Sequence, residues 1–221
     1  MRPPQTNLAS HQPEEFLGDF QALAGHVGSS DDLALAGEVN ASLRLDHVTD
    51  LAGLKTFLEN YRTELLLPVE MPLICRAYLH ASRNEYSELL SLDRQLANEV
   101  RFDFFSSASK RIGQIQLKRL RLLRDQRGLQ RYITAVDGGE AHAWHTVVYG
   151  ITLASFSLPL RQGLMNYAGQ VLNGFVRASG SLSRFAPADT HHLLNQNIAA
   201  IPPLIDKLLS DCQFVPRIQV S

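Results

Sequence analysis

The sequence is poor in the features of disulfide-stabilised, secreted and membrane-spanning proteins. It holds two cysteines in 221 residues, Cys75 and Cys212, which lie far apart and outside any C-x-x-C spacing. The stretch MRPPQTNLASHQPEEF lacks the apolar core of a signal peptide, and no later window approaches about 18 uninterrupted apolar residues. We therefore expect reduced thiols, no membrane partner and a cytoplasmic location.

Motifs of nucleotide and hydrolytic chemistry are also missing. The chain has neither a G-x-x-x-x-G-K-[ST] nor a G-x-G-x-x-G phosphate cradle, and it has no G-x-S-x-G nucleophile turn. Its acidic residues are scattered over expected solvent faces, so no pair of carboxylates with shifted pKa values is indicated. A formal net charge of −1 gives no general attraction to nucleic acid. These absences favour a protein that binds other molecules over an enzyme.

Helical periodicity dominates the sequence. Hydrophobic residues make up 45% of the chain, and they recur at intervals of three and four rather than two. The pattern therefore predicts an all-α fold, a single-domain bundle of many helices. We expect a flexible tail at residues 1–13, a helical domain over residues 14–211 and a second short tail at residues 212–221.

Prolines divide the expected domain into segments. A helix capped by Thr49 is expected to stop before Pro68, because proline supplies no amide hydrogen and clashes with the preceding turn. For the same reason, the Pro202-Pro203 pair is expected to interrupt the last helical stretch. Between these points, the stretch from Trp144 to Leu158 is apolar nearly all round, which predicts a central helix surrounded by others.

The stretch from about Phe104 to Val136 is expected to form one long helix with most of the local positive charge. Residues 110–131 hold eight lysines and arginines against a single acid, Asp125. Most of these cations lie opposite an apolar arc, whereas Arg119 falls within it. The basic face is either simply solvated or bound to an anionic protein or phosphate group. Arg119 either joins a buried ion pair or contributes to a contact surface.

Two histidines, His142 and His145, lie three residues apart on either side of Trp144, the only tryptophan. On one helix they would share a face and could hold a metal ion. The pattern is not H-E-x-x-H, because Ala143 and Trp144 separate the histidines and Glu140 precedes both. Two histidines leave a tetrahedral metal site short of ligands, so a structural or capping role is favoured over a metal-dependent enzyme.

The order of the segments resembles that of the UreF family of urease accessory proteins over about residues 45–210. Four stretches carry the likeness: LDHVTDLAGLKTFLENY, LLLPVEMPLICRAYLHASRNEYSELLSLDRQL, SSASKRIGQIQLKRL and WHTVVYGITLASFSLPLRQGLMNYAGQVLNGFVRASG. The third stretch places Ser107, Ser109 and Gly113 on family positions. The fourth stretch does the same for His145, Tyr149, Gly150 and Arg177.

The resemblance implies a non-catalytic helical scaffold of urease maturation. UreF-like proteins form homodimers, bind the accessory protein UreD, also called UreH, and present a surface to the GTPase UreG, so that nickel reaches apo-urease. No cofactor would be bound permanently, nickel would pass in transit, and neither nucleic acid nor a membrane would be a partner. We expect a partner-binding surface that includes Ser107, Ser109, Lys110, Gly113, Arg119, His142, His145, Tyr149 and Arg177. A helix from Leu160 to about Ala178 contains small residues that suit the close packing of a dimer, at Gly163, Ala168, Gly169 and Gly174.

The chain also departs from the family pattern. No Ser-x-Gly-Leu-Glu motif precedes Asp46, and the Gly-Gln pairs expected after Arg177 are replaced by ASGSLSRFAPADTHH. These departures indicate a divergent member. They keep a second function open, that of a helical binding or regulatory module whose residues 110–131 contact an anionic partner, with nucleic acid as one example.

Overall fold

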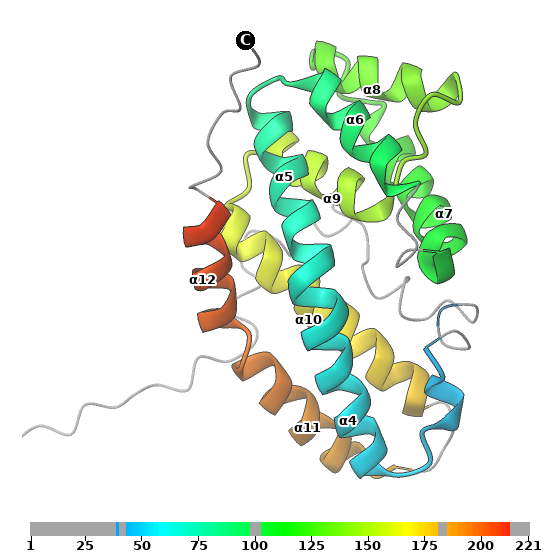
Figure 1. Ribbon diagram of the computed structural model, residues 1–221, viewed down its shortest axis with the longest axis vertical. Helices are drawn as coiled ribbons and strands as arrows, with labels where there is room; N and C mark the ends of the chain where they lie inside the picture. Colours follow the sequence, from blue (N-terminus) through cyan, green and yellow to red (C-terminus); the bar gives the residue numbers. More distant parts are fainter. Residues whose placement is uncertain (1–38, 40–42, 98–102, 181–184, 213–221) are drawn as a thin grey trace, which may run out of the picture.

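The computed structural model describes Val39 and residues 43–97, 103–180 and 185–212. Every regular element in these residues is a helix, and Figure 1 shows the helices as an elongated bundle. The predicted all-α fold is therefore confirmed. None of these helices is long and apolar enough to cross a bilayer. The predicted tail at residues 1–13 and the domain's first part lie outside the described residues, so the predicted domain boundaries stay predictions.

A long rod runs through the bundle. It consists of α4 (Leu51–Tyr61), the π-helical segment η3 (Arg62–Glu70) and α5 (Met71–Ser82). The N-cap of the rod is Asp50 rather than the expected Thr49. The Asp50 carboxylate accepts a hydrogen bond of 2.7 Å from the amide of Gly53, which satisfies one of the unpaired donors at the helix start.

The expected helix stop before Pro68 is wrong, because η3 carries the rod through this residue. A proline in an α-helix removes one amide donor and crowds the carbonyl oxygen one turn earlier. The wider turns of a π-helix, in which hydrogen bonds span five residues, give that carbonyl more room. The rod therefore passes the proline and still buries Leu66, Val69 and Glu70.

Helix α9 (His145–Ser155) lies at the centre of the bundle, as its apolar sequence predicts. Every residue from His145 to Leu153 is buried. The helix packs most extensively against α5 and also against α7 (Asp103–Leu120), α6 (Tyr86–Leu96) and α10 (Leu160–Gly180).

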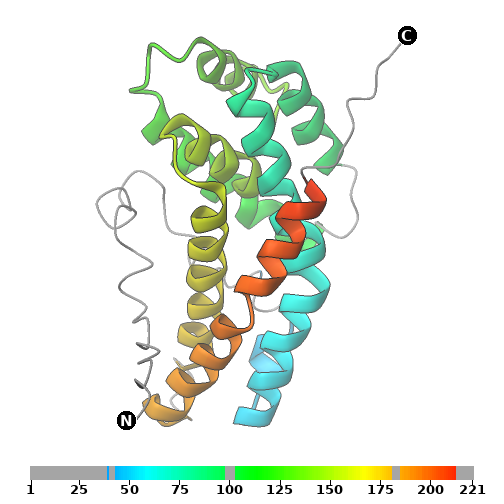
Figure 2. The ribbon, with the colours of Figure 1, turned by 90° about the vertical axis from the view of Figure 1, so that its left-hand side faces the viewer.

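Helix α10 forms a second rod. It packs against α4, α5, α11 (Pro187–Ala199) and α12 (Pro202–Cys212). Figure 2 shows α11 and α12 following one another along the side of the bundle. The chain leaves the helical path at Ala200 and Ile201, which confirms the interruption expected at Pro202-Pro203. Cys212 is the last residue of α12 rather than part of a tail, and residues 213–221 of the predicted tail lie outside the described residues.

Two of the small residues of α10 pack within the chain. A Cβ atom on Gly163 would lie 2.4 Å from a methyl carbon of Leu153, and Ala168 is fully buried. Gly169 instead faces open space, since no neighbouring group lies within 4 Å of a Cβ atom placed there. Gly163 and Ala168 thus pack within the chain, and Gly169 leaves room beside the helix, so neither observation tests whether this helix packs across a dimer. Dimer formation stays a prediction from the family resemblance.

Helices α6, α7 and α8 (Arg127–Asp137) gather at one end of the bundle. The single helix expected from Phe104 to Val136 is wrong, because the chain turns between Leu120 and Arg127. Packing explains the turn. Gly128 lies so close to α6 that a Cβ atom there would overlap the ring of Tyr86. This tertiary contact overrides the helix propensity of the intervening residues.

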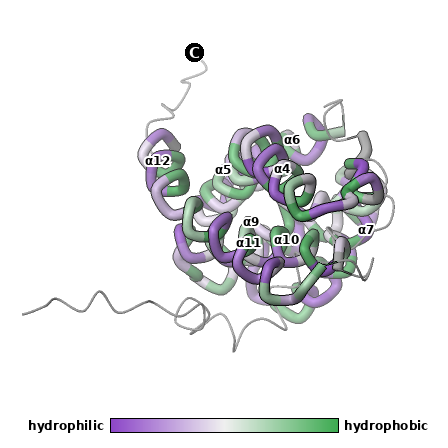
Figure 3. Tube along the Cα trace, turned by 90° about the horizontal axis from the view of Figure 1, so that it is seen from below, coloured by the Kyte–Doolittle hydropathy of each residue, from purple (hydrophilic) through white to green (hydrophobic). Residues whose placement is uncertain are grey.

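The buried side chains form one connected core from Val39 to Ile205. Seen along the long axis in Figure 3, α9 and α10 lie between α12 at one edge and α7 at the other. The largest fully buried side chains include Trp144, Tyr132, Tyr149, Tyr167 and Phe175. Three of these five aromatic residues are tyrosines, so the core must also provide partners for buried hydroxyl groups.

Replacement of Gly150 by alanine tests the crossing of α5 and α9. The new Cβ atom would lie 2.7 Å from the Ala77 Cβ atom and 2.7 Å from the Ile74 carbonyl oxygen, so one helix must shift. We expect Gly150→Ala to lower the free energy of unfolding by about 1 to 3 kcal/mol, as measured by urea denaturation. The control Gly169→Ala adds helix propensity in open space and should raise stability by about 0.5 to 1 kcal/mol. Equal effects of the two variants would contradict the tight crossing.

Candidate partner-binding site

Several residues predicted to bind partners converge where α6 and α7 meet the start of α9. Residues 141–144 form a short non-helical segment, with Ala143 at a positive φ of 58°, just before α9 begins. Ser109, Lys110 and Gly113 of α7 contact this segment or the first residue of α9. We call this place the α7–α9 junction and define it by Asp93, Ser109, Lys110, Gly113 and residues 141–145.

The carboxylate of Asp93, on α6, is fully buried at the junction. One of its oxygens accepts a hydrogen bond of 2.6 Å from the His142 amide. The other accepts bonds of 2.7 Å from the Tyr132 hydroxyl and 3.4 Å from the Trp144 amide. The Asp93 carbonyl oxygen also accepts a bond of 3.0 Å from the Trp144 indole. Because a buried carboxylate needs such donors in place of water, Asp93 and the segment of residues 141–144 hold each other in position.

Ser109 caps α9 from a different helix. The first amides of any helix have no partner within it. The residue before α9, Trp144, offers no side-chain cap. Instead, the His145 amide donates a hydrogen bond of 3.0 Å to the Ser109 hydroxyl, and both residues are buried. This bond ties α7 to the start of α9.

Gly113 allows α7 to approach the junction closely. A Cβ atom there would lie 1.9 Å from the Ala143 carbonyl oxygen and 2.9 Å from the His145 nitrogen. One turn earlier, the Lys110 ammonium lies 4.6 Å from the centre of the Trp144 ring, which makes a cation–π contact. The predicted residues of α7 that point inward thus serve packing between helices.

The predicted shared helical face of His142 and His145 is wrong. α9 starts at His145, and the half-buried His142 precedes it in the non-helical segment of residues 141–144. His145 is fully buried, and neither of its ring nitrogens has a hydrogen-bond partner among the residues that the structure describes. Burial lowers its pKa from 6.5 to about 4, so its imidazole is neutral at pH 7. Within the described ranges, no three His, Cys, Asp or Glu side chains gather in a group that could hold a metal ion.

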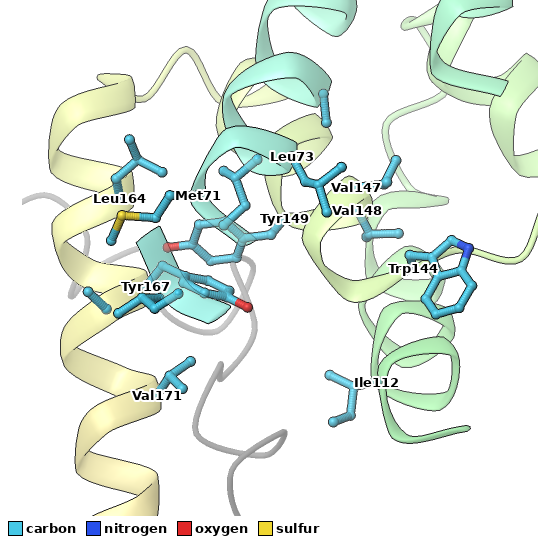
Figure 4. Close-up of a cluster of buried hydrophobic side chains, with 14 of the residues drawn as sticks. Met71, Leu73, Ile112, Trp144, Val147, Val148, Tyr149, Leu164, Tyr167 and Val171 are labelled. Atoms are coloured by element: carbon cyan, nitrogen blue, oxygen red, sulfur yellow. The ribbon is translucent and has the colours of Figure 1, made fainter. Parts of the chain in front are cut away.

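Tyr149 connects α9 to α10, as Figure 4 shows. Its hydroxyl donates a hydrogen bond of 3.0 Å to the Gly163 carbonyl oxygen and accepts one of 3.2 Å from the Asn166 side chain. Its ring meets that of Tyr167 edge to face, with 5.1 Å between the ring centres. Burial raises the pKa of Tyr149 above its ordinary value. The predicted contact residue Tyr149 is therefore part of the core.

Glu70, in η3, is a second buried acid. The Tyr61 hydroxyl donates a hydrogen bond of 2.6 Å to one of its oxygens. Burial raises the pKa of Glu70 from 4.5 to about 7, although the hydroxyls of Tyr61 and Tyr167 act in the opposite direction. The centre of the Tyr167 ring also lies 5.7 Å from the centre of the His145 ring. A neutral histidine and an acid with a pKa near 7 thus belong to one polar cluster inside the core.

Three predicted residues lie at the surface. Ser107 and Arg119 are exposed on α7, and Arg177 is exposed on the carboxyl-terminal part of α10. The buried ion pair considered for Arg119 is therefore wrong, while its place on a contact surface stays a prediction. The structure divides the candidates into a buried group that shapes the junction and an exposed group that a partner can touch.

The sequence-based prediction misses both buried acids. Asp93 shares a helical face with Leu89, Leu92 and Leu96. An acid among inward-facing leucines is a pattern that reveals such a residue, because burial of a charge requires nearby donors. Glu70 lies in the stretch LPVEMP, where nothing in the local sequence distinguishes it from an exposed acid.

A polar hollow of about 460 Å³ opens between the ends of α5 and α9 and the starts of α6 and α8. Its lining includes one acid, Asp125, and one base, Arg127, and contains no histidine or cysteine. This lining is a poor match for acid–base or metal catalysis, which needs converging titratable groups.

Replacement of Asp93 by alanine tests the junction. The change leaves the Tyr132 hydroxyl and the amides of His142 and Trp144 buried without an acceptor. We expect a loss of about 3 to 5 kcal/mol in the free energy of unfolding. Because Trp144 is the only tryptophan, its fluorescence during urea denaturation reports on the junction directly.

The control for this variant is Gln95→Ala, at an exposed position of the same helix. It should change stability by no more than about 0.5 kcal/mol. Similar unfolding midpoints for the two variants would show that Asp93 does not hold the junction.

Glu70 and His145 make opposite contributions to the pH dependence of stability. Glu70 has a raised pKa in the folded chain, so its contribution is fully present below about pH 4.5 and is lost as pH rises through 7. His145 has a lowered pKa, so its contribution is present above about pH 6.5 and is lost as pH falls through 4. Between about pH 4.5 and pH 6.5, the stability lost through Glu70 and the stability gained through His145 as pH rises nearly cancel in the wild-type protein.

The variant Glu70→Gln removes one of the two titrations and keeps an oxygen that can accept the Tyr61 hydrogen bond. Its stability relative to wild type should rise from about pH 4.5 to about pH 7.5, by up to about 3 kcal/mol. Urea denaturation of both proteins at several pH values in this range measures the difference. A stability difference that does not vary with pH would rule out a buried, titrating Glu70.

Comparison with known proteins identifies the family of this chain. A search of curated proteins finds no match. The family model of UreF matches residues 48–197, which include the rod, the α7–α9 junction and every residue predicted above to bind partners. This match covers more than half of the chain and agrees with the resemblance seen in the order of its segments. The chain belongs to the UreF family of urease accessory proteins.

Proposed function

We propose that this protein is a non-catalytic scaffold that binds UreD/UreH and the GTPase UreG and thereby supports nickel insertion into apo-urease. The observation that carries the proposal is the family match over residues 48–197. The sequence has no phosphate cradle of its own, which is consistent with a nucleotide that binds to the partner GTPase. Nickel is the cargo of this process, and the protein acts in the cytoplasm as a homodimer.

The positions of the predicted residues support two different roles for them, one for the buried residues and one for the exposed residues. Ser109, Gly113 and His145 are buried and influence partners through the position of α7 against α9, whereas the buried Tyr149 acts through the position of α9 against α10. The exposed candidates Ser107, Arg119 and Arg177 are available for direct contact. A scaffold needs both features, because an interface binds well only when the elements that present it are already fixed.

The alternative function, a basic helix that contacts an anionic partner, receives less support. The expected continuous helix over residues 110–131 is divided into α7 and α8 by the turn after Leu120. One of its cations, Arg121, is paired with Asp137 through two hydrogen bonds, one of them 2.9 Å long. The cations therefore do not form one uninterrupted basic face.

Binding to purified partners tests the proposed function. We expect the full-length protein to form complexes with UreD/UreH, and with UreG in their presence, at micromolar concentrations. Size-exclusion chromatography coupled to light scattering measures both the complexes and the predicted homodimer. The protein alone should show no GTP hydrolysis, and metal analysis after purification without chelator should show no tightly held nickel.

The proposal fails if none of the accessory proteins or apo-urease associates with the chain at these concentrations. Stoichiometric nickel in the isolated protein, lost on replacement of His142 or His145, would instead favour the metal-dependent enzyme considered from the sequence.

A further inference from the structure

The outward face of α7 combines positive charge with exposed apolar side chains. Arg111, Ile115 and Lys118 follow one another at helical spacing on this face, and Arg119 lies beside them. Leu122 continues the face just beyond the helix end. We call this surface the α7 stripe and define it as Arg111, Gln114, Ile115, Lys118, Arg119 and Leu122.

The exposure of Ile115 and Leu122 is unusual for this molecule. Three large hydrophobic side chains are exposed in the part of the chain that the structure describes, and these are two of them. Ile115 is 49% exposed and Leu122 is 80% exposed. Ile115 lies on α7 and Leu122 lies two residues beyond its end, and exposed aliphatic side chains that neighbour one another are more typical of a contact surface than single ones.

The opposite side of α7 already has its partner. Ile112, Gly113, Leu117 and Leu120 are buried, and α9 is the helix against which α7 packs most extensively. The Ser109 hydroxyl and the close approach at Gly113 fix this side. The stripe is therefore presented on a helix whose position is already determined.

The charge of the stripe indicates the chemistry of its partner. From Phe104 to Arg124 the sequence contains six lysines and arginines and no acid. Arg111 and Arg119 also interact elsewhere within the chain, so the argument uses the exposure of these cations rather than a lack of partners. A surface that surrounds two aliphatic side chains with cations is complementary to an apolar patch bordered by carboxylates.

We propose that the α7 stripe is a docking surface for an acidic, partly apolar surface of one of the urease accessory proteins. This inference rests on the proposed function and assigns one of its interfaces to a place in the fold. The apolar side chains form the centre of the contact, and the cations at its border fix the orientation and speed association.

Two other occupants fit the stripe less well. A symmetric dimer would place the stripe against its own copy, so that cations would face cations. Nucleic acid would satisfy the cations, because its backbone is anionic, but phosphates offer no counterpart for Ile115 and Leu122. An acidic protein surface matches both features.

The test uses the full-length protein with purified UreD/UreH and UreG, first separately and then together. The variants Lys118→Glu and Ile115→Ser change exposed side chains and should leave the thermal unfolding midpoint within a few degrees of wild type. We expect each variant to weaken binding of one accessory protein about tenfold or more. Wild-type binding should also weaken as the salt concentration rises.

The matched control is Lys55→Glu, the same charge reversal on α4, towards the other end of the bundle in Figure 1. It should change the same affinity less than about twofold, because α4 lies away from α7 in the bundle and salt screens exposed charges that are far from the contact. A loss of affinity equal to that of Lys118→Glu would attribute the effect to net charge and overturn the inference.

The remaining outcomes separate this inference from the proposed function. If wild type binds no accessory protein, the proposed function itself fails. If wild type binds and both stripe variants bind equally well, the function stands and the stripe is not the docking surface. Loss of the dimer in the stripe variants would assign the stripe to a second copy of the chain. Loss of salt-sensitive binding to a DNA duplex, with partner binding retained, would assign it to nucleic acid. Either outcome would overturn the inference.

Discussion

The buried start of α9 is the constraint on which the rest of the structure depends. A helix enclosed on all sides begins with amides that water cannot reach, so each amide needs an acceptor from another element. Asp93 supplies acceptors for the amides of His142 and Trp144, and Ser109 supplies one for His145. Because these acceptors belong to α6 and α7, the same bonds that complete α9 also position both neighbouring helices. The arrangement is stable because a carboxylate that has lost water gains several donors in return.

Local sequence predicts much of the fold, since helical periodicity and the Pro202-Pro203 break depend on residues close together in the chain. It fails at Pro68, where a widened helix accommodates the proline, and after Leu120, where contact between Gly128 and Tyr86 turns the chain. The candidate site is likewise only partly predictable from residues close together in the chain. Family resemblance selects residues that meet at the junction, but spacing along the chain does not reveal that most of them are buried. Their partner Asp93 comes from a separate helix.

Two titratable groups of the described core, Glu70 and His145, have pKa values shifted by burial. Burial raises the pKa of Glu70 to about 7 and lowers that of His145 to about 4, and neither residue lines the polar hollow beside α8. Such groups make the free energy of unfolding depend on pH. A member of a urease accessory family with this interior is suited to hold surfaces in fixed positions, and the α7 stripe is the exposed counterpart of the buried junction. One helix thereby connects the core to the proposed interface.

Amide hydrogen exchange of the free protein, read at His142, Trp144 and His145, tests the central claim most directly. If acceptors from α6 and α7 complete the start of α9, these amides exchange only when the whole chain unfolds. Their exchange should then be as slow as that of amides inside α9, before any partner is added. Fast exchange in the free protein that becomes slow only on partner binding would contradict the account, because the junction would then be built by the partner rather than by the fold.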